Sequence, residues 1–442
     1  MKKIFYALPC FILFFPLIVY SQTNADTSLK VVSLKQCVDF ALRNQPTVRQ
    51  ASIDEAINER NINISLSAWL PQISGSGVYD YYFKGTPIVP SGSSSTTSGN
   101  LNNLSTLGLQ ANQVIYNNDV LQAAKAARYS RLYYKENTTS SQINVVSDVS
   151  KAFFDVLLSQ RQLDILNEDI RRLQRSLKDA YSQYQAGVVD KTDYKQATIA
   201  LNNSLASRKQ TEESIKSKLA YLKQIMGFNP DNKLTLSYDS TRYESEAIID
   251  TNQRLDVNNR IEYQLLQTQK NLQNINVNYY KWGFLPSVSA TGNYNLFYLS
   301  NSFSTLYDKS FPNAYVGLTL AIPIFQGGKR LQNLSKARLQ ADRADLDIVN
   351  SRNTINTEYV QALASYKSNY TNWQFLKQNV DLAKDVYKVV SLQYREGIKT
   401  YLDVIVAQSD LRTAELNYYN ALFQLLSSKI DLQKALGTLT VQ

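Results

Sequence analysis

The sequence predicts a mixed α and β membrane protein, in which strands contribute to a barrel and very long helices extend away from it. Two observations lead to this fold class. Residues 314–322 alternate along the chain, so that one face of a strand is wholly apolar and the other carries Gly and Thr. Residues 331–394 then contain no Pro and no Gly. A helix of about 65 residues spans about 100 Å, which no compact domain requires.

Composition argues against most enzyme classes. The 442 residues include no His, which is the usual general base and the commonest metal ligand. We therefore expect no catalytic residues, no cofactor and no metal site. The formal charge of +10 is spread in mixed-sign segments such as residues 167–172. We interpret these segments as solvated coiled-coil faces, and expect no nucleic-acid binding.

The N-terminus predicts export. Two lysines precede an apolar run over residues 4–19, and polar residues follow, as in a cleaved secretory signal peptide over residues 1–21. Cys10 would be lost with the leader, which leaves Cys37 as a small buried residue without a disulfide partner. No later apolar stretch is long enough for a membrane-spanning helix, so any membrane span must use strands.

The first half of the chain is expected to form one structural repeat over residues 22–228. Pro46 suits the first turn of a helix that ends near Trp69, and Gly187 and Gly227 suit the ends of two later helices. The expected elements are helices over 34–41 and 47–69, strands over 71–84 and 101–115 with an exposed loop between them, and helices over 118–186 and 190–227.

The second half repeats this order over residues 256–442, after an irregular connector over residues 229–255. The sequence Tyr184–Gly187 matches Tyr394–Gly397 at an offset of about 210 positions. Residues 163–184 and 373–394 both carry apolar side chains at alternating spacings of three and four, which is typical of a coiled-coil seam. The expected elements are a helix over 261–282, strands over 286–299 and 312–324, and helices over 329–396 and 400–437.

Four strands cannot close a barrel, and an open sheet edge in lipid leaves backbone groups unpaired. Two copies would supply eight strands, and three copies twelve, which is wide enough for a lumen. Aromatic residues near strand ends are either an interface girdle or simply good strand formers. They are Tyr81, Tyr82, Phe83, Tyr298 and Tyr315.

The chain resembles the TolC family of outer-membrane efflux channels over essentially the whole mature sequence. The resemblance is carried by residues 41–46, by Ile322–Arg330 with its Pro and two Gly, by the two Tyr-x-x-Gly turns and by residues 435–439. It implies a homotrimer with a twelve-stranded barrel in the outer membrane, four strands per chain, continued by a long α-helical barrel through the periplasm. It also implies a periplasmic adaptor protein and an inner-membrane transporter of RND or ABC type as partners.

The resemblance also implies roles for individual residues. Those matching a periplasmic gate are Thr192, Asp193, Tyr394, Lys399 and Asp403. Those at hairpin tips that would meet the adaptor are Tyr184, Gly187 and Gly397. Those at the turns between barrel and helix are Pro71, Pro286, Pro323, Gly327 and Gly328. A second acidic ring one turn after Asp403 is absent, because Val406 stands there.

Simpler roles are also open for these residues. An acidic side chain in the first turn of a helix interacts favourably with the helix dipole and needs no gating role. Tyr184 and Tyr394 also suit the last seam positions of their coils. Gly327-Gly328-Lys329 is not a phosphate loop, because Pro323 stands where that motif needs its first Gly.

Three functions fit the sequence. The preferred one is an outer-membrane exit duct that passes small toxic compounds or drugs outward, driven by an adaptor and an inner-membrane pump. The second is the outlet of a type I protein secretion system. The third, from a different class, is a periplasmic coiled-coil scaffold or adhesin, which would lack a pore.

Overall fold

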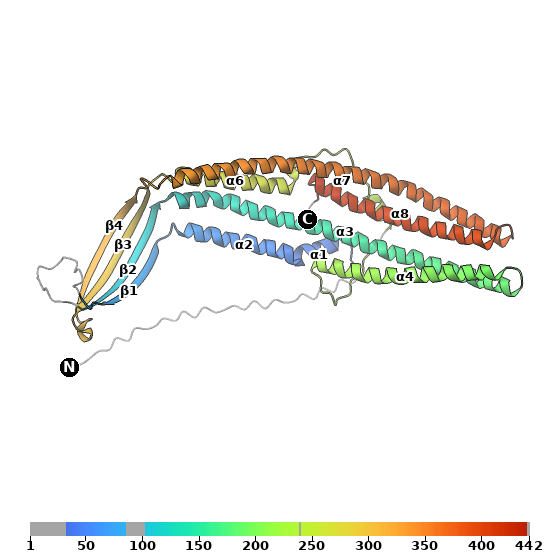
Figure 1. Ribbon diagram of the computed structural model, residues 1–442, viewed down its shortest axis with the longest axis horizontal. Helices are drawn as coiled ribbons and strands as arrows, with labels where there is room; N and C mark the ends of the chain where they lie inside the picture. Colours follow the sequence, from blue (N-terminus) through green and yellow to red (C-terminus); the bar gives the residue numbers. More distant parts are fainter. Residues whose placement is uncertain (1–31, 85–101, 238–239, 440–442) are drawn as a thin grey trace.

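The computed structural model describes residues 32–84, 102–237 and 240–439. The predicted signal peptide and most of the predicted loop over residues 84–100 lie outside the described residues. A β-sheet occupies one end of the elongated molecule, and helices run from it to the opposite end (Figure 1). No helix in the described ranges is both long and apolar enough to cross a membrane.

The first repeat begins and ends its helices with recognisable caps. Ser33 and Gln36 form a capping box at the first helix, and Pro46 occupies the first turn of the second. Asn117 caps the third helix through its side chain, and Gly227 ends the fourth with φ of 66°. The elements are α1 (Leu34–Asn44), α2 (Pro46–Ser67), β1 (Gln72–Tyr81), β2 (Asn103–Tyr116), α3 (Asn118–Gln185) and α4 (Lys191–Met226).

The second repeat has nearly the same element lengths as the first. Helices α2 and α6 each contain 22 residues, α3 and α7 contain 68 and 67, and α4 and α8 contain 36 each. This agreement confirms that the fold is built from two internal repeats. The elements are α5 (Ser240–Glu246), η1 (Val257–Asn259), α6 (Ile261–Trp282), β3 (Ser287–Ser300), η2 (Phe303–Thr305), β4 (Ser310–Ala321), α7 (Lys329–Arg395) and α8 (Tyr401–Leu436).

Two segments differ from the sequence expectation. The connector is not wholly irregular, because it contains helix α5 and a parallel bridge between Val32 and Leu236. Strand β4 begins at Ser310 and ends at Ala321 rather than covering 312–324. The apolar alternation continues beyond the ladder, but Pro323 lacks a backbone N–H and cannot extend it.

The four strands form one antiparallel sheet in the order β1-β2-β3-β4. Its register aligns Ile73, Ala111, Gly292 and Val316 in one row across the sheet. The next row along consists of Ser74, Gln110, Asn293 and Tyr315. Since alternate rows face opposite sides, one face of the sheet is mainly apolar and the other mainly polar in this middle part of the sheet. Tyr315 therefore lies mid-strand on the polar face, and its interpretation as a girdle residue at a strand end is wrong.

The main hydrophobic core lies where α1, α3, α4, α7 and α8 meet the connector. Phe153, Leu157 and Leu422 are fully enclosed there, and Cys37 is buried as expected. Tyr366 ties the connector to α7, because its hydroxyl donates to the carbonyl of Ala247 and accepts from the N–H of Ile249.

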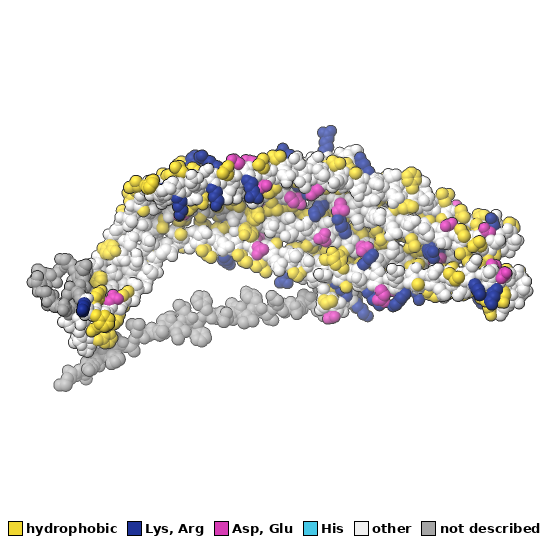
Figure 2. Space-filling model, in the orientation of Figure 1, with side chains coloured by type: hydrophobic (Ala, Val, Ile, Leu, Met, Phe, Trp, Pro, Cys, Tyr) yellow, Lys and Arg dark blue, Asp and Glu magenta, His cyan; other side chains and the backbone are white. Residues whose placement is uncertain are grey.

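Charged side chains of both signs are intermingled along the helices (Figure 2). However, residues 167–172 are not all solvated as the sequence analysis expected, because Asp169 is only 1% exposed. This carboxylate lies between helices and accepts hydrogen bonds from α4 and α8.

Candidate functional site: the hairpin tips and the outward sheet face

Two helical hairpins, α3–α4 and α7–α8, end at the side of the molecule farthest from the sheet (Figure 1). Their turns have matching backbone geometry. Gly187 and Gly397 adopt φ of 77° and 76°, and each donates its N–H to the carbonyl of the tyrosine three residues earlier, at 3.0 Å. No atom lies within 4 Å of a Cβ added to either glycine, so the requirement for Gly is one of backbone conformation.

One side-chain hydrogen bond joins the two tips. The hydroxyl of Tyr394, at the end of α7, donates to Oε1 of Gln183, at the end of α3, at 2.9 Å. Burial raises the pKa of Tyr394, so the phenol keeps its proton and remains a donor. Gln183 is not among the gate residues predicted from the sequence, although its place one residue before Tyr184 mirrors Gln393 before Tyr394.

A small apolar cluster lies just behind this hydrogen bond. Ala180, Ala197 and Tyr401 are buried in it, and Tyr194 and Tyr394 pack against them. The tips of both hairpins therefore touch within one chain through a few aromatic and small side chains.

Lys399 and Asp403 lie at the start of α8, and both take part in its N-terminal cap region. Asp403 accepts hydrogen bonds from the N–H of Thr400 at 2.9 Å and from its hydroxyl at 2.8 Å. These hydrogen bonds, followed by the charge of Lys399 at 3.9 Å, lower the pKa of Asp403. Helix capping thus accounts for part of this arrangement.

Thr192 and Asp193 lie in the first turn of α4, where Asp190 is the capping residue. The N–H of Thr192 donates to Oδ1 of Asp190 at 3.1 Å. Among the described residues of one chain, no hydrogen bond joins Thr192 or Asp193 to Tyr394 or Lys399. The first hairpin also holds Tyr184, whose ring packs on Tyr194 with centroids 5.1 Å apart. The gating roles of these residues remain a prediction.

The turns between sheet and helices are built differently in the two repeats. Pro71 and Pro286 each directly precede a strand, and Pro323 follows β4. In the second repeat Gly327 and Gly328 both have positive φ, and Gly328 is the N-cap of α7. In the first repeat the side chain of Asn117 caps α3 instead, accepting from the N–H of Asp119 at 2.7 Å.

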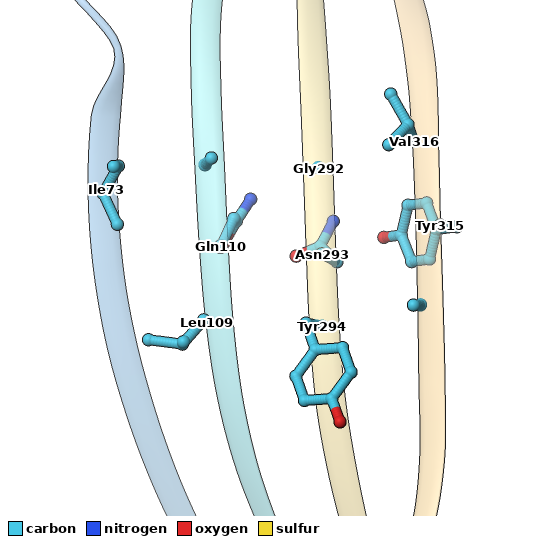
Figure 3. A pocket seen from close by; sticks show the side chains of 10 residues that line it. Ile73, Leu109, Gln110, Gly292, Asn293, Tyr294, Tyr315 and Val316 are labelled. Atoms are coloured by element: carbon cyan, nitrogen blue, oxygen red, sulfur yellow. The ribbon is translucent and has the colours of Figure 1, made fainter.

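The apolar face of the sheet carries a shallow groove that crosses all four strands. Ile73, Leu109, Tyr294 and Val316 are among the residues that line it, and Gly292 lies between β2 and β4 on β3 (Figure 3). Val316 is 87% exposed in a single chain. An alternating strand with a continuous exposed apolar face is typical of the lipid-facing side of an outer-membrane barrel.

Comparison with known proteins agrees with this architecture. A family model described as outer membrane efflux protein matches residues 38–228 and 258–438. The chain belongs to the outer membrane efflux protein family. The two matched segments fall within the two predicted repeats and omit the connector between them.

Individual members of the outer membrane efflux protein family are similar over almost their whole length. The outer membrane protein TolC of Vibrio cholerae is 22% identical over 422 residues, which cover 93% of this chain and 92% of the relative. The probable efflux pump outer membrane protein TtgC of Pseudomonas putida is 22% identical, with coverage of 92% and 83%. The crystal structure of the CmeC outer membrane channel of Campylobacter jejuni has a TM-score of 0.75 at 19% identity, covering 92% of this chain and 85% of that chain.

This protein is thus an outer-membrane efflux channel of a Gram-negative bacterium, with strands for the barrel and long helices that extend into the periplasm. Of the three functions that the sequence left open, the efflux channel is the one supported.

Proposed function

We propose that three copies of this chain close into one channel with a twelve-stranded barrel. The observation that carries the proposal is the open sheet, whose order leaves β1 and β4 as unpaired edges. In lipid each unpaired backbone group costs several kcal/mol, so the edges must pair with neighbouring chains. Three sheets of four strands give a barrel wide enough for a lumen, whereas two would give one filled by side chains.

The hairpin tips form the periplasmic entrance and its gate in this proposal. They lie at the end opposite the barrel, and their polar contacts are partly exposed. Exposed contacts of this kind are worth about 0–1 kcal/mol each, so a partner protein can break them at small cost. The partner is a periplasmic adaptor that binds the tips around Tyr184, Gly187 and Gly397 and connects the channel to an inner-membrane transporter of RND or ABC type.

The cargo in this proposal is a small toxic compound. Relatives at 22% identity include an antibiotic efflux pump outer membrane protein and a toluene efflux pump outer membrane protein, both of Pseudomonas putida. The channel itself is a passive duct, which opens when the adaptor and pump engage it.

Two measurements test the proposal. The mature chain purified in detergent is expected to have the mass of a trimer and to conduct ions in planar bilayers. A deletion strain is expected to become sensitive to drugs and solvents while its protein secretion continues. A pore-free single subunit would overturn the trimeric channel, and loss of secretion alone would favour the type I outlet.

A further inference from the structure

The two hairpins of one chain are joined by a buried polar network that lies well behind the tips. Its centre is Asp169 on α3, which is 1% exposed. Its Oδ2 accepts from the hydroxyl of Ser204 on α4 at 2.8 Å, and its Oδ1 accepts from Nε2 of Gln408 on α8 at 2.9 Å. One carboxylate of α3 thus binds side chains of α4 and α8, so it joins three helices from both hairpins.

Two arginines complete this network. Nη1 of Arg412 on α8 donates to Oδ2 of Asp169 at 3.2 Å and to the hydroxyl of Ser204 at 2.9 Å. Arg172 on α3 lies 3.8 Å from Asp169 and 4.0 Å from Glu415, and its guanidinium lies 6.0 Å from the ring centroid of Tyr387 on α7. Through Tyr387 the network reaches the fourth hairpin helix.

This network differs in kind from the contacts at the tips. A buried carboxylate that loses its partners remains as an uncompensated charge, whereas an exposed ion pair such as Lys399–Asp403 is readily replaced by water. The small cluster around Tyr401 lies between the network and the tips. Asp169 precedes Gly187 by eighteen residues, or about 27 Å of helix.

From this contrast we infer that Asp169 is a positioning residue, the pivot that holds α3, α4 and α8 in register while the hairpin tips separate. The inference rests on the proposed tip gate. The network keeps its hydrogen bonds in both states, and the segment of about 27 Å beyond it bends. In the closed state the same register brings Tyr394 against Gln183.

Two cross-links between engineered cysteines test the pivot. Each is made with a bis-maleimide that contains a reducible disulfide, because long side chains that meet at their ends leave the backbones too far apart for a direct disulfide. Cys37 is buried, and burial raises the pKa of its thiol to about 12, so it does not compete for the reagent. Gln183→Cys with Tyr394→Cys joins the tips, where the native side chains meet at 2.9 Å. Gln162→Cys with Asn420→Cys joins α3 and α8 about two turns behind Asp169, where the native side-chain amides lie 3.2 Å apart.

We expect the tip cross-link to abolish efflux and the rear cross-link to leave it unchanged, with a reducing agent restoring the tip variant. If both cross-links block efflux, the helices slide at the network, and the pivot is wrong while the gate stands. If the rear cross-link alone blocks efflux, the gate and the pivot are both wrong. If neither blocks efflux, the tip gate itself is wrong and the pivot with it.

A substitution tests the residue directly. Asp169→Asn keeps the shape of the side chain but removes the charge that Arg412 and Arg172 face. We expect the fraction of channels that are open at rest to rise about tenfold, which corresponds to about 1.4 kcal/mol. The comparison uses variant trimers whose thermal unfolding shows an intact barrel.

The matched control is Asp164→Asn, which removes an exposed charge from the same helix, where Asp164 pairs only with Arg161 among the contacts seen. If Asp169→Asn trimers fail to assemble, the milder Ser204→Ala is expected to raise resting conductance in the same direction, because it removes the two hydrogen bonds of the Ser204 hydroxyl, to Asp169 and from Arg412, and leaves the carboxylate in place. Resting conductance equal to that of Asp164→Asn in assembled trimers of either variant would overturn the inference.

Discussion

Gly187 and Gly227 both adopt left-handed φ, at 77° and 66°, but only Gly227 is enclosed. A Cβ at Gly187 would meet nothing within 4 Å, whereas one at Gly227 would lie 2.6 Å from the carbonyl oxygen of Asn44. Gly437 repeats the second arrangement against Asn259, at the same distance. The tip glycines are therefore needed for conformation alone, and the two inner glycines also for close backbone packing.

Substitution by alanine separates these two requirements. Gly187→Ala is expected to cost about 1 kcal/mol from the left-handed conformation, and Gly227→Ala roughly 2–4 kcal/mol because a backbone clash is added. Thermal unfolding of detergent-solubilised protein, followed by helical circular dichroism, measures both. Equal shifts in melting temperature would contradict the packing role of Gly227.

Removing the contacts at the hairpin tips is expected to raise the ion conductance of the resting channel. Tyr394→Phe deletes the hydroxyl that donates to Gln183, and Lys399→Ala deletes the cation beside Asp403. We expect the double variant to conduct more than wild type at rest in planar bilayers, because the hydrogen bond from Tyr394 to Gln183 joins the two hairpins and is worth about 0–1 kcal/mol, and because Lys399 occupies a predicted gate position. Tyr359→Phe is the control, since it removes a tyrosyl hydrogen bond to the carbonyl of Gln253, far from the tips. A double variant that behaves like this control would argue against the gate assignment.

The lowered pKa of Asp403 predicts how the entrance responds to pH. Its hydrogen bonds from Thr400 and the charge of Lys399 favour the carboxylate. The stabilisation is therefore fully present above the ordinary carboxyl pKa, near 4, and is lost only as pH falls through the lower folded value. Cation block at the entrance is thus expected to be the same at pH 7 and pH 5, because three ionised carboxylates persist in the trimer. Asp403→Ala is expected to weaken the block at both pH values, and Asp410→Ala, on the exposed side of the same helix, is expected not to.

At the scale of the element, the sequence predicted the strand faces and most helix ends for simple reasons. The alternation of residues 316–322 indicates the apolar face directly. Gly187, Gly227 and Gly397 mark helix ends, because each adopts the left-handed conformation that ends a helix. Contacts between helices are harder to predict. Asp169 directly precedes Ile170, which is a seam position, so Asp169 stands beside the seam, where a charged side chain is expected to face solvent. The burial of Asp169 is explained by Gln408 and Arg412, which hydrogen-bond to it in the folded chain. They follow it by 239 and 243 residues in the sequence, so the local pattern does not predict these contacts.

The two faces of β4 predict opposite tolerances to charge at neighbouring positions. Leu318 pairs with Ala290 on the apolar face, and Thr319 pairs with Ser289 on the polar face. Leu318→Arg is expected to cost about 2–4 kcal/mol if it faces lipid near the midplane, and Thr319→Arg far less. The amount of heat-modifiable trimer in outer-membrane fractions measures the difference. Similar losses for both variants would show that the faces are assigned wrongly.

At the scale of the whole molecule, the matched lengths of the two repeats require that both hairpins reach the same plane. Helices α4 and α8 contain 36 residues each, and α3 and α7 differ by one residue. The sequence predicts this equality through the repeated Tyr-x-x-Gly turns. The sequence of one chain does not predict how many copies meet at that plane, because the barrel closes by pairing of sheet edges that belong to different chains.

Equal reach can be tested by shortening the hairpins. Removing one heptad from each of α3, α4, α7 and α8, on the sheet side of the Asp169 network, shortens the tube by about 10 Å and keeps both tips level. We expect such trimers to assemble and to conduct like wild type in bilayers, but to lose efflux in cells because the tips no longer reach the adaptor. Removing the heptads from α3 and α4 alone displaces Gln183 from Tyr394, and we expect a channel that leaks at rest. If the evenly shortened protein retains efflux, the tips are not the docking site. If the unevenly shortened channel stays closed at rest, level tips are not needed for closure.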